Sequence, residues 1–137
     1  MPLTLEIVTP DAKVYSEEVD HVVVPTTSGK IDILPNHVPI IGKLIPGDLK
    51  VEKNGSLDYL AVSSGFVEVY SNKVSILTDE ALIVSETDDA AIEKAVKRAQ
   101  EALAEGKKSN LDIAAIQKLE AAARFALAQQ IAKGKTR

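Results

Sequence analysis

Polar and apolar residues alternate with a period of two in short segments of the first 85 residues, which is typical of β-strands with one buried face. All six prolines lie in this part of the chain. Asn54-Gly55 and Ser71-Asn72-Lys73 each separate two alternating segments, so we predict a β-hairpin at both places. The predicted strands cover residues 3–8, 19–24 (ended by Pro25), 31–33, 49–52, 57–61, 66–70 and 74–77. Short strands with such frequent turns predict a β-sandwich or barrel of about 85 residues.

The period changes to 3.6 from residue 86 onward, where alanine dominates and proline is absent. Thr87 or Asp88 is placed to cap a first helix, and residues 106–110 are expected to end it. The apolar stripe of this helix comprises Ile92, Val96, Ala99 and Leu103.

Ser109 or Asn110 is placed to cap a second helix, which is expected to end at Gly134. Its apolar stripe comprises Ile116, Leu119, Ala123, Leu127 and Ile131. Two helices with so short a connection predict an antiparallel hairpin. The pattern thus divides the chain into a β-domain, residues 1–85, and an α-helical hairpin, residues 86–137. Because its seam is mostly alanine, the hairpin buries little area per residue, and we expect it to be movable.

Charge divides at the same boundary, although the whole chain has a net charge of −4. Residues 1–85 carry six lysines against twelve acidic residues, whereas residues 86–137 carry ten Lys and Arg against eight acidic residues. The basic second helix favours an acidic protein partner, and a solvated helix face explains the same charges. The acidic balance and the 4% aromatic content argue against a dedicated nucleic-acid binder.

No group of residues in the sequence has the pattern of a catalytic, metal or cofactor site. Cysteine is absent, and His21 and His37 are too few and too far apart to predict a metal centre. Ser28-Gly29-Lys30 resembles the end of a phosphate-binding loop but lacks its first glycine and its Ser or Thr. The N-terminus lacks signal-peptide features, and no apolar run approaches the roughly 20 residues of a membrane span, so any membrane role is expected to be peripheral.

Residues 34–41 contain two prolines and an apolar tail within the strand-rich region. Fixed φ angles make this segment stiff. It is either a docking surface or a loop folded onto its own core.

Four stretches carry a family likeness in order along the chain: residues 5–10, 29–39, 64–69 and 74–81. With the helical tail behind them, the sequence resembles the epsilon subunit of F-type ATP synthases, in bacterial or plastid form. The resemblance implies an N-terminal antiparallel β-sandwich followed by a C-terminal antiparallel two-helix hairpin, which agrees with the periodicity.

The resemblance also implies a function that is mechanical rather than catalytic, with no cofactor. The family's sandwich lies in the central stalk, bound to the gamma subunit and the c-subunit ring, so that ion-driven rotation reaches the catalytic head of alpha and beta subunits. Its hairpin either lies folded or extends along gamma, where basic residues meet an acidic segment of beta and restrain ATP hydrolysis.

Carried over by position, the resemblance implies three contact regions. The ring-facing positions are Lys30, Ile31, Asn36, His37 and Val38, although some relatives have an acidic residue where this chain has lysine. The gamma-facing positions are Thr9, Gly42, Ser63, Glu68 and Ser75. The positions that meet beta are Lys118, Arg124 and Lys133.

Some bacterial members bind ATP through an Ile/Leu-Asp-x-x-Arg-Ala motif at the start of the first helix. In this chain Ala91 or Val96 stands at the arginine position, so we expect no nucleotide site. The expected location is the cytoplasmic face of the bacterial inner membrane, or the stromal face of the thylakoid, reached only through the complex. Two alternatives are a stand-alone β-domain that binds a small molecule or nucleotide under a helical lid, and an adaptor whose hairpin docks to a partner bundle.

Overall fold

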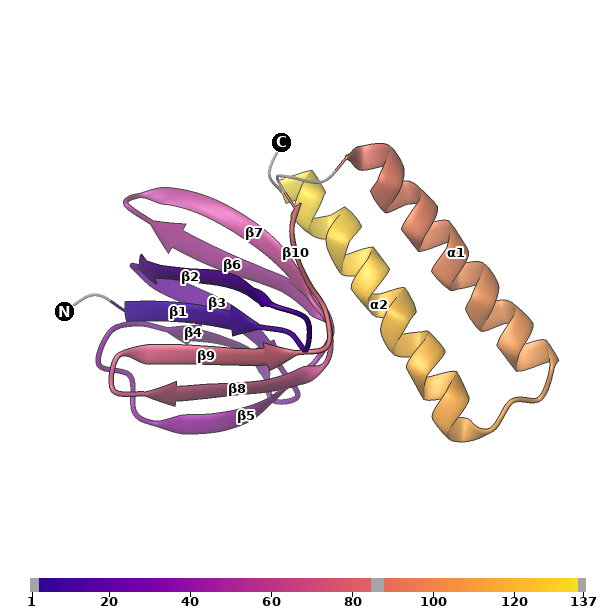
Figure 1. The fold of residues 1–137 in the computed structure, drawn as a ribbon, viewed down its shortest axis with the longest axis horizontal. Helices are drawn as coiled ribbons and strands as arrows, with labels where there is room; N and C mark the ends of the chain where they lie inside the picture. The colour runs from indigo at the N-terminus through magenta and orange to yellow at the C-terminus, as the bar shows by residue number, and fades with distance from the viewer. Residues whose placement is uncertain (1–2, 85–87, 136–137) are drawn as a thin grey trace.

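The computed structural model describes residues 3–84 and 88–135. Residues 3–84 form ten strands, which are followed by two helices (Figure 1). The strands are β1 Leu3–Val8, β2 Lys13–Val19, β3 His21–Thr26, β4 Gly29–Ile33, β5 Ile40–Leu44, β6 Gly47–Lys53, β7 Ser56–Val62, β8 Gly65–Tyr70, β9 Lys73–Thr78 and β10 Ala81–Ile83. The helices are α1 Asp89–Lys108 and α2 Ile113–Lys135.

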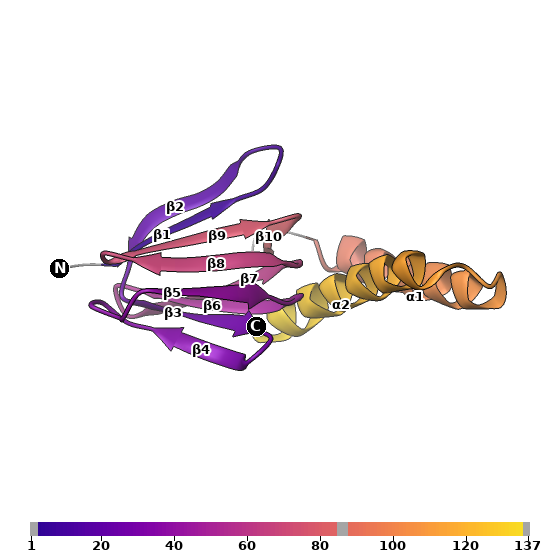
Figure 2. The same cartoon turned by 90° about the horizontal axis from the view of Figure 1, so that it is seen from below.

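The strands form one sheet that folds over on itself, in the order β10-β7-β6-β3-β5-β8-β9-β1-β2, with β4 attached to β3. β1 and β9 pair in parallel, and the remaining pairs between described strands are antiparallel. Figures 1 and 2 show the folded sheet with the helical hairpin at one end. The predicted fold class, a β-sandwich followed by a two-helix hairpin, is confirmed.

Period-two alternation produces the core of the sandwich. In β8, Val67 and Val69 are buried while Phe66, Glu68 and Tyr70 are exposed. The same alternation on the other strands fills the interior with aliphatic side chains of zero or near-zero exposure, and the largest of them are Leu3, Leu5, Ile7, Ile33, Leu44, Leu49, Leu60 and Ile76. Fully burying one such side chain stabilises a fold by about 1.5–3 kcal/mol, so this core accounts for most of the sandwich's stability.

Both predicted hairpins are present with left-handed turn residues. The φ angles are 52° at Asn54 and 80° at Gly55, and 49° at Ser71 and 60° at Asn72. Two consecutive residues with positive φ give the type I′ geometry that matches the twist of the flanking strands.

The prediction for residues 19–24 was wrong at both ends. Val19 ends β2, and the chain turns at Asp20, whose backbone N–H donates to the Glu52 carbonyl at 2.7 Å. Pro25 lies inside β3 opposite Lys30 of the edge strand β4, and it does not end the strand. A proline is tolerated there because Pro25 falls between residues 21–23, which pair with β6, and Thr26, which pairs with β5, so neither of these two ladders uses an N–H at this position.

The helix caps agree in part with the prediction. The Asp88 side chain accepts from the Ala90 N–H at 3.3 Å and caps α1, while Thr87 lies outside the described residues. The predicted caps Ser109 and Asn110 were wrong for α2, because Asp112 accepts from the Ala115 N–H at 2.8 Å.

α1 ends at Lys108, within the predicted range of residues 106–110, and Gly106 itself is buried within the helix. A Cβ there would lie 2.6 Å from Leu119 Cδ1, so glycine permits the close approach of α1 and α2. Contrary to expectation, α2 continues past Gly134 to Lys135.

The predicted apolar stripe of α2 was wrong in its second half. Leu127 and Ile131 are 36% and 54% exposed, whereas Phe125, Ala128 and Ala132 are buried in a cluster that also contains Ala61 of β7 and Val84, which follows β10. α2 lies between the sandwich and α1 (Figure 1), so it must bury one face on each, and the face toward the sheet is mostly alanine.

Candidate functional site

The outer surface of the strands β5, β8 and β9, which we call the outer sheet face, carries exposed apolar side chains. Ile41, Phe66, Tyr70 and Leu77 are 78%, 56%, 66% and 51% exposed. Phe66 lies directly opposite Leu77 in the β8–β9 ladder, so these two side chains form one continuous patch. Adjacent large apolar groups on a surface are typical of an interaction site.

Residues 34–39, which we call the end loop, lie at the end of the sandwich away from the hairpin (Figure 2). Leu34 and Val38 are 51% and 67% exposed, so the loop is not folded onto its own core. The Asn36 N–H donates to Asn72 Oδ1 at 2.5 Å, and the His37 N–H donates to the Leu34 carbonyl at 3.2 Å. These bonds hold two exposed apolar side chains on a fixed backbone.

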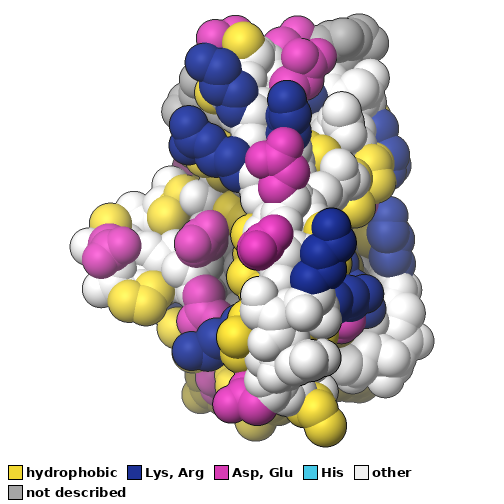
Figure 3. All heavy atoms as spheres, turned by 90° about the vertical axis from the view of Figure 1, so that its right-hand side faces the viewer, with side chains coloured by type: hydrophobic (Ala, Val, Ile, Leu, Met, Phe, Trp, Pro, Cys, Tyr) yellow, Lys and Arg dark blue, Asp and Glu magenta, His cyan; other side chains and the backbone are white. Residues whose placement is uncertain are grey.

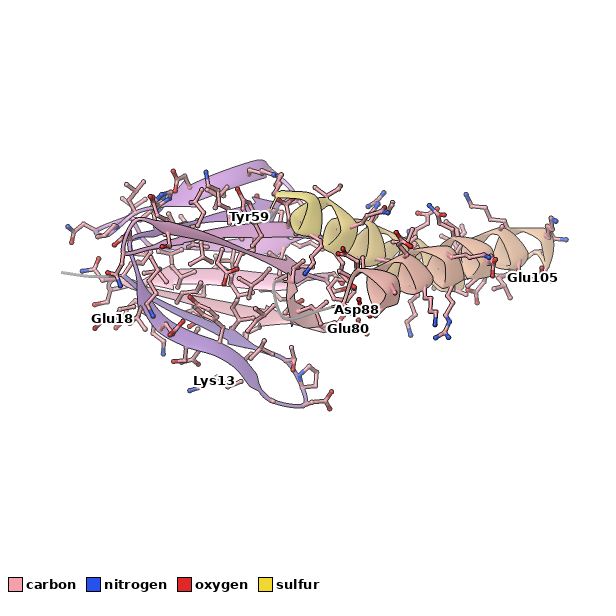
Figure 4. All side chains as sticks on the ribbon, turned by 90° about the horizontal axis from the view of Figure 1, so that it is seen from above. Lys13, Glu18, Tyr59, Glu80, Asp88 and Glu105 are labelled. Carbon is pink, nitrogen blue, oxygen red and sulfur yellow. The ribbon has the colours of Figure 1, made fainter. Side chains whose placement is uncertain are left out.

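The end of α2 is tied to the sandwich by a group that we call the latch: Lys30, Asp48, Tyr59 and Lys135. Lys135 Nζ lies 2.8 Å from one carboxylate oxygen of Asp48, and Lys30 Nζ lies 3.5 Å from the other. Lys135 Nζ also lies 5.6 Å from the centre of the Tyr59 ring, within cation–π range. Figure 4 shows Tyr59 beneath the end of α2.

The pKa shifts of Asp48 and Lys135 favour the charged form of each side chain. Burial acts to raise the pKa of Asp48, but the hydrogen bond from Lys135 and the charges of Lys135 and Lys30 outweigh it and hold that pKa below its usual range. The hydrogen bond to Asp48 raises the pKa of Lys135. A second attachment is made by Lys133, whose Nζ donates to the Val84 carbonyl at 3.3 Å.

His21 joins three strands at the end of the sheet. Its Nδ1 lies 2.9 Å from Asp32 Oδ1 on β4, and its Nε2 contacts Glu52 on β6. Burial acts to lower the pKa of His21, but the bonds to the two carboxylates raise it above its ordinary value. Within residues 3–84 and 88–135, no group of three His, Asp or Glu side chains is arranged to hold a metal ion.

Comparison with known proteins relates this geometry to one family. The family model for the β-sandwich domain of the ATP synthase delta/epsilon chain matches residues 2–84. An ATP synthase epsilon chain of Halalkalibacterium halodurans is 40% identical over 110 residues, covering 80% of this chain and 83% of that one. An epsilon chain of Herpetosiphon aurantiacus is 45% identical over 103 residues, with 75% and 76% coverage. The chain belongs to the ATP synthase delta/epsilon family.

Solved structures agree with this assignment. A chain in the cryo-EM structure of the Euglena gracilis mitochondrial ATP synthase, which contains OSCP, F1 and the c-ring, superposes with a TM-score of 0.73 at 26% identity, covering 96% of this chain and 81% of that one. A chain of the Tetrahymena thermophila central stalk and c-ring has a TM-score of 0.54 at 15% identity and shows the shared fold alone. The chain is thus an epsilon-type, non-catalytic subunit of the central stalk, in a complex associated peripherally with a membrane. Neither described helix is long and apolar enough to cross a bilayer.

The gamma-facing positions implied for an epsilon subunit fall in three places. Glu68 and Ser75 are directly opposite each other on the outer sheet face, and Thr9 borders a hollow beside Phe66 and Leu77.

Two other gamma-facing positions lie away from that face. Gly42 is directed inward, since a Cβ there would lie 3.4 Å from Val67 Cγ1. Ser63 is only 8% exposed and lines a hollow between the sandwich and the helices together with Phe125.

The five positions implied to face the c-ring are also divided between the two ends of the sandwich. Asn36, His37 and Val38 belong to the end loop. Lys30 instead belongs to the latch at the hairpin end, and Ile31 packs against the sandwich core. Six residues of largely extended chain separate Lys30 from Asn36 by up to about 20 Å, which is why positions close in sequence lie at different ends.

The three cations implied to meet beta lie on different sides of α2. Lys118 lines the hollow that contains Ser63, Arg124 lines a hollow beside Pro46, and Lys133 is bonded to Val84. Figure 3 shows that Lys and Arg on the hairpin side are interspersed with Asp and Glu, so no surface of a single charge is formed there. Sequence reasoning missed Asp48 and Lys135, because 87 residues separate them and neither belongs to a recognisable motif.

Proposed function

We propose that this epsilon chain transmits rotation within the ATP synthase by docking its outer sheet face on the gamma subunit. The observation that carries the proposal is the exposure of Ile41, Phe66, Tyr70 and Leu77 in the isolated chain. Covering apolar area contributes about 25 cal/mol per Å², and neighbouring large side chains give such a patch the area that a stable contact needs. Glu68 and Ser75 supply polar groups beside the patch.

The second contact is between the end loop and the c-ring. Leu34 and Val38 offer apolar groups there, and the bonds to Asn72 spare the loop the entropy cost of ordering when it binds. Because the end loop and the hairpin lie at opposite ends of the sandwich, ring contact leaves the hairpin accessible (Figure 2). The bacterial relatives favour the cytoplasmic face of the membrane as the location.

The hairpin, in this proposal, restrains ATP hydrolysis when it leaves the sandwich. Its docked state is held by a small alanine-rich cluster, the latch and the Lys133 bond, so a few kcal/mol separate the docked and released states. Release allows Lys118, Arg124 and Lys133 to approach an acidic segment of beta. Residues 1–85 and 86–137 thus act as separate docking and regulatory units.

The test of gamma docking is the substitution Phe66→Glu, which places a charge in the centre of the outer sheet face without disturbing the core. We expect at least a tenfold loss of affinity for gamma, equivalent to about 1.4 kcal/mol or more. Ile113→Glu, which changes a 77% exposed residue of α2, is the matched control. Val38→Asp should instead uncouple ion pumping while gamma binding persists. Normal gamma affinity in the Phe66 variant would refute the docking surface.

Removing residues 110–137 tests the restraint, and it is expected to raise ATP hydrolysis by the assembled enzyme. Lys118→Gln with Arg124→Gln should give part of that rise, most visibly at low salt, because exposed ion pairs are each worth only about 0–1 kcal/mol. Lys133 is left unchanged, since its bond to Val84 also supports the docked state. An unchanged hydrolysis rate after truncation would refute the regulatory role and leave gamma docking untouched.

A further inference from the structure

An apolar groove lies between the sandwich and α2, on the side of α2 that carries Leu127 and Ile131. One wall consists of Pro25 at the end of β3 with Ile45 and Pro46 before β6, and the two α2 side chains form the other wall. The hollow has a volume of about 360 Å³. This is within the range of small-molecule sites, about 300–1,000 Å³.

The sandwich wall of the groove is rigid. Pro25 and Pro46 have fixed φ angles, and the Ile45 N–H donates to the Pro25 carbonyl at 3.2 Å. Gly47 packs so closely behind them that a Cβ there would lie 3.1 Å from Pro25 Cβ. A ligand would therefore meet a preformed surface and would not need to order it.

The charged groups at the groove give it a positive character. Lys30, Asp48 and Arg124 line it, and Lys135 reaches Asp48 from the end of α2. The Asp48 charge is balanced by Lys135 at 2.8 Å and by Lys30 at the longer distance of 3.5 Å. Arg124 is exposed and makes no side-chain hydrogen bond or ion pair within the described part of the chain. One guanidinium and part of one ammonium thus remain available to an anion.

We propose that this groove binds a small amphiphilic carboxylate, with its hydrocarbon chain between Pro46, Leu127 and Ile131 and its carboxylate at Arg124. The charge of the rim selects an anion, and the planar guanidinium suits a carboxylate because it donates two parallel hydrogen bonds. A volume of about 360 Å³ suits a small molecule better than a docked helix, which needs anchors over at least two turns. Placing the hydrocarbon chain in the groove removes apolar surface from water, which favours binding.

Because the groove has one wall on each unit, the carboxylate binds the docked hairpin and not the released one. Binding therefore favours the docked state by mass action. This consequence, unlike the binding itself, rests on the proposed regulatory function. Where that function holds, the ligand relieves the restraint on hydrolysis.

The binding test is a calorimetric titration of the isolated full chain with decanoate. We expect one saturable site with a dissociation constant of about 100 μM. Replacing Leu127 and Ile131 by serine should weaken binding at least tenfold, while Ile113→Ser, on the same helix but far from the groove, should not. Arg124→Gln should weaken decanoate and leave 1-decanol unaffected. The exposed positions keep these variants folded, which thermal unfolding checks.

Four outcomes would overturn the proposal. The first is the absence of saturable binding, and the second is binding retained after both α2 substitutions. Equal affinity for 1-decanol and decanoate would refute recognition of the carboxylate. Sedimentation that shows a dimer lost in the Ile131 variant would assign the groove to a second copy of the chain. None of these measurements depends on the ATP synthase, so failure of the regulatory proposal would be visible separately in hydrolysis assays.

Discussion

Substituting Lys135 by glutamine is expected to loosen the docked hairpin by about 2 kcal/mol. The change removes a 2.8 Å charged hydrogen bond to Asp48, whose side chain is 11% exposed. Such bonds contribute about 1.5–3 kcal/mol, and the lower end applies because the Lys135 side chain is 42% exposed. The lost cation–π contact with Tyr59 adds about 0.5 kcal/mol. Lys30 remains near the carboxylate at 3.5 Å and limits the penalty for leaving it buried.

A loss of about 2 kcal/mol shifts the ratio of docked to released hairpin about 30-fold. Amide hydrogen exchange of residues 125–132, in the half of α2 that packs on the sheet, should accelerate accordingly. Lys97→Gln, an exposed cation on α1, is the control and should leave exchange unchanged. Asp48→Asn should reproduce the effect, and the double variant should cost less than the two single changes combined, because both remove the same bond.

The same substitution distinguishes release from removal of the hairpin. In the assembled enzyme, Lys135→Gln should lower ATP hydrolysis because it populates the released, restraining state, whereas truncation of residues 110–137 should raise it. Unchanged exchange in the Lys135 variant would refute the latch. Accelerated exchange with unchanged hydrolysis would refute the link between release and restraint.

Two further predictions concern the sandwich. Because the pKa of His21 is raised in the folded state, the bonds to Asp32 and Glu52 stabilise the fold fully below about pH 6.5 and lose this effect as pH rises through the folded pKa. Urea unfolding should thus show the difference between wild type and His21→Gln shrinking from pH 6 to alkaline pH, and a constant difference would contradict it. Gly65→Ala should destabilise the sandwich by about 3 kcal/mol, because its Cβ would lie 1.9 Å from the Leu77 carbonyl oxygen. Gly134→Ala, whose Cβ would have no neighbour within 4 Å, should not destabilise the protein. Equal urea midpoints for the two variants would refute the clash at Gly65.

Strands with strong alternation and marked turns could be predicted from the sequence, and the weaker ones could not. β8, β9 and their Ser71-Asn72 turn carry both signals. β2 carries neither, because this edge strand exposes Ser16, Glu17 and Glu18 in succession and so lacks a buried period. β10 has only three residues, which are too few to show any period.

The orientation of α2 could not be predicted because alanine surrounds the whole helix. With small apolar residues on every side, the largest side chains no longer mark the buried face. Packing against the sandwich determines the orientation of α2. Phe125, Ala128 and Ala132 pack in one cluster with Ala61 and Val84, and Leu127 and Ile131 line the groove. The latch and the groove both depend on which face of α2 packs on the sandwich, so neither could be predicted from the sequence.

Part of the basic charge of the hairpin is neutralised by the acidic sandwich. The sequence left open whether the basic helix meets an acidic partner or is a solvated face, and in the structure Lys135 is paired with Asp48 of the same chain. Lys133 is similarly engaged with Val84. These cations are therefore paired within the chain in the docked state. In the proposed regulation they meet beta only after release, so intramolecular and intermolecular contacts compete for them. In this proposal, salt screens both the intramolecular and the intermolecular ion pairs, so the dependence of ATP hydrolysis on ionic strength reflects the difference between the two sets of contacts.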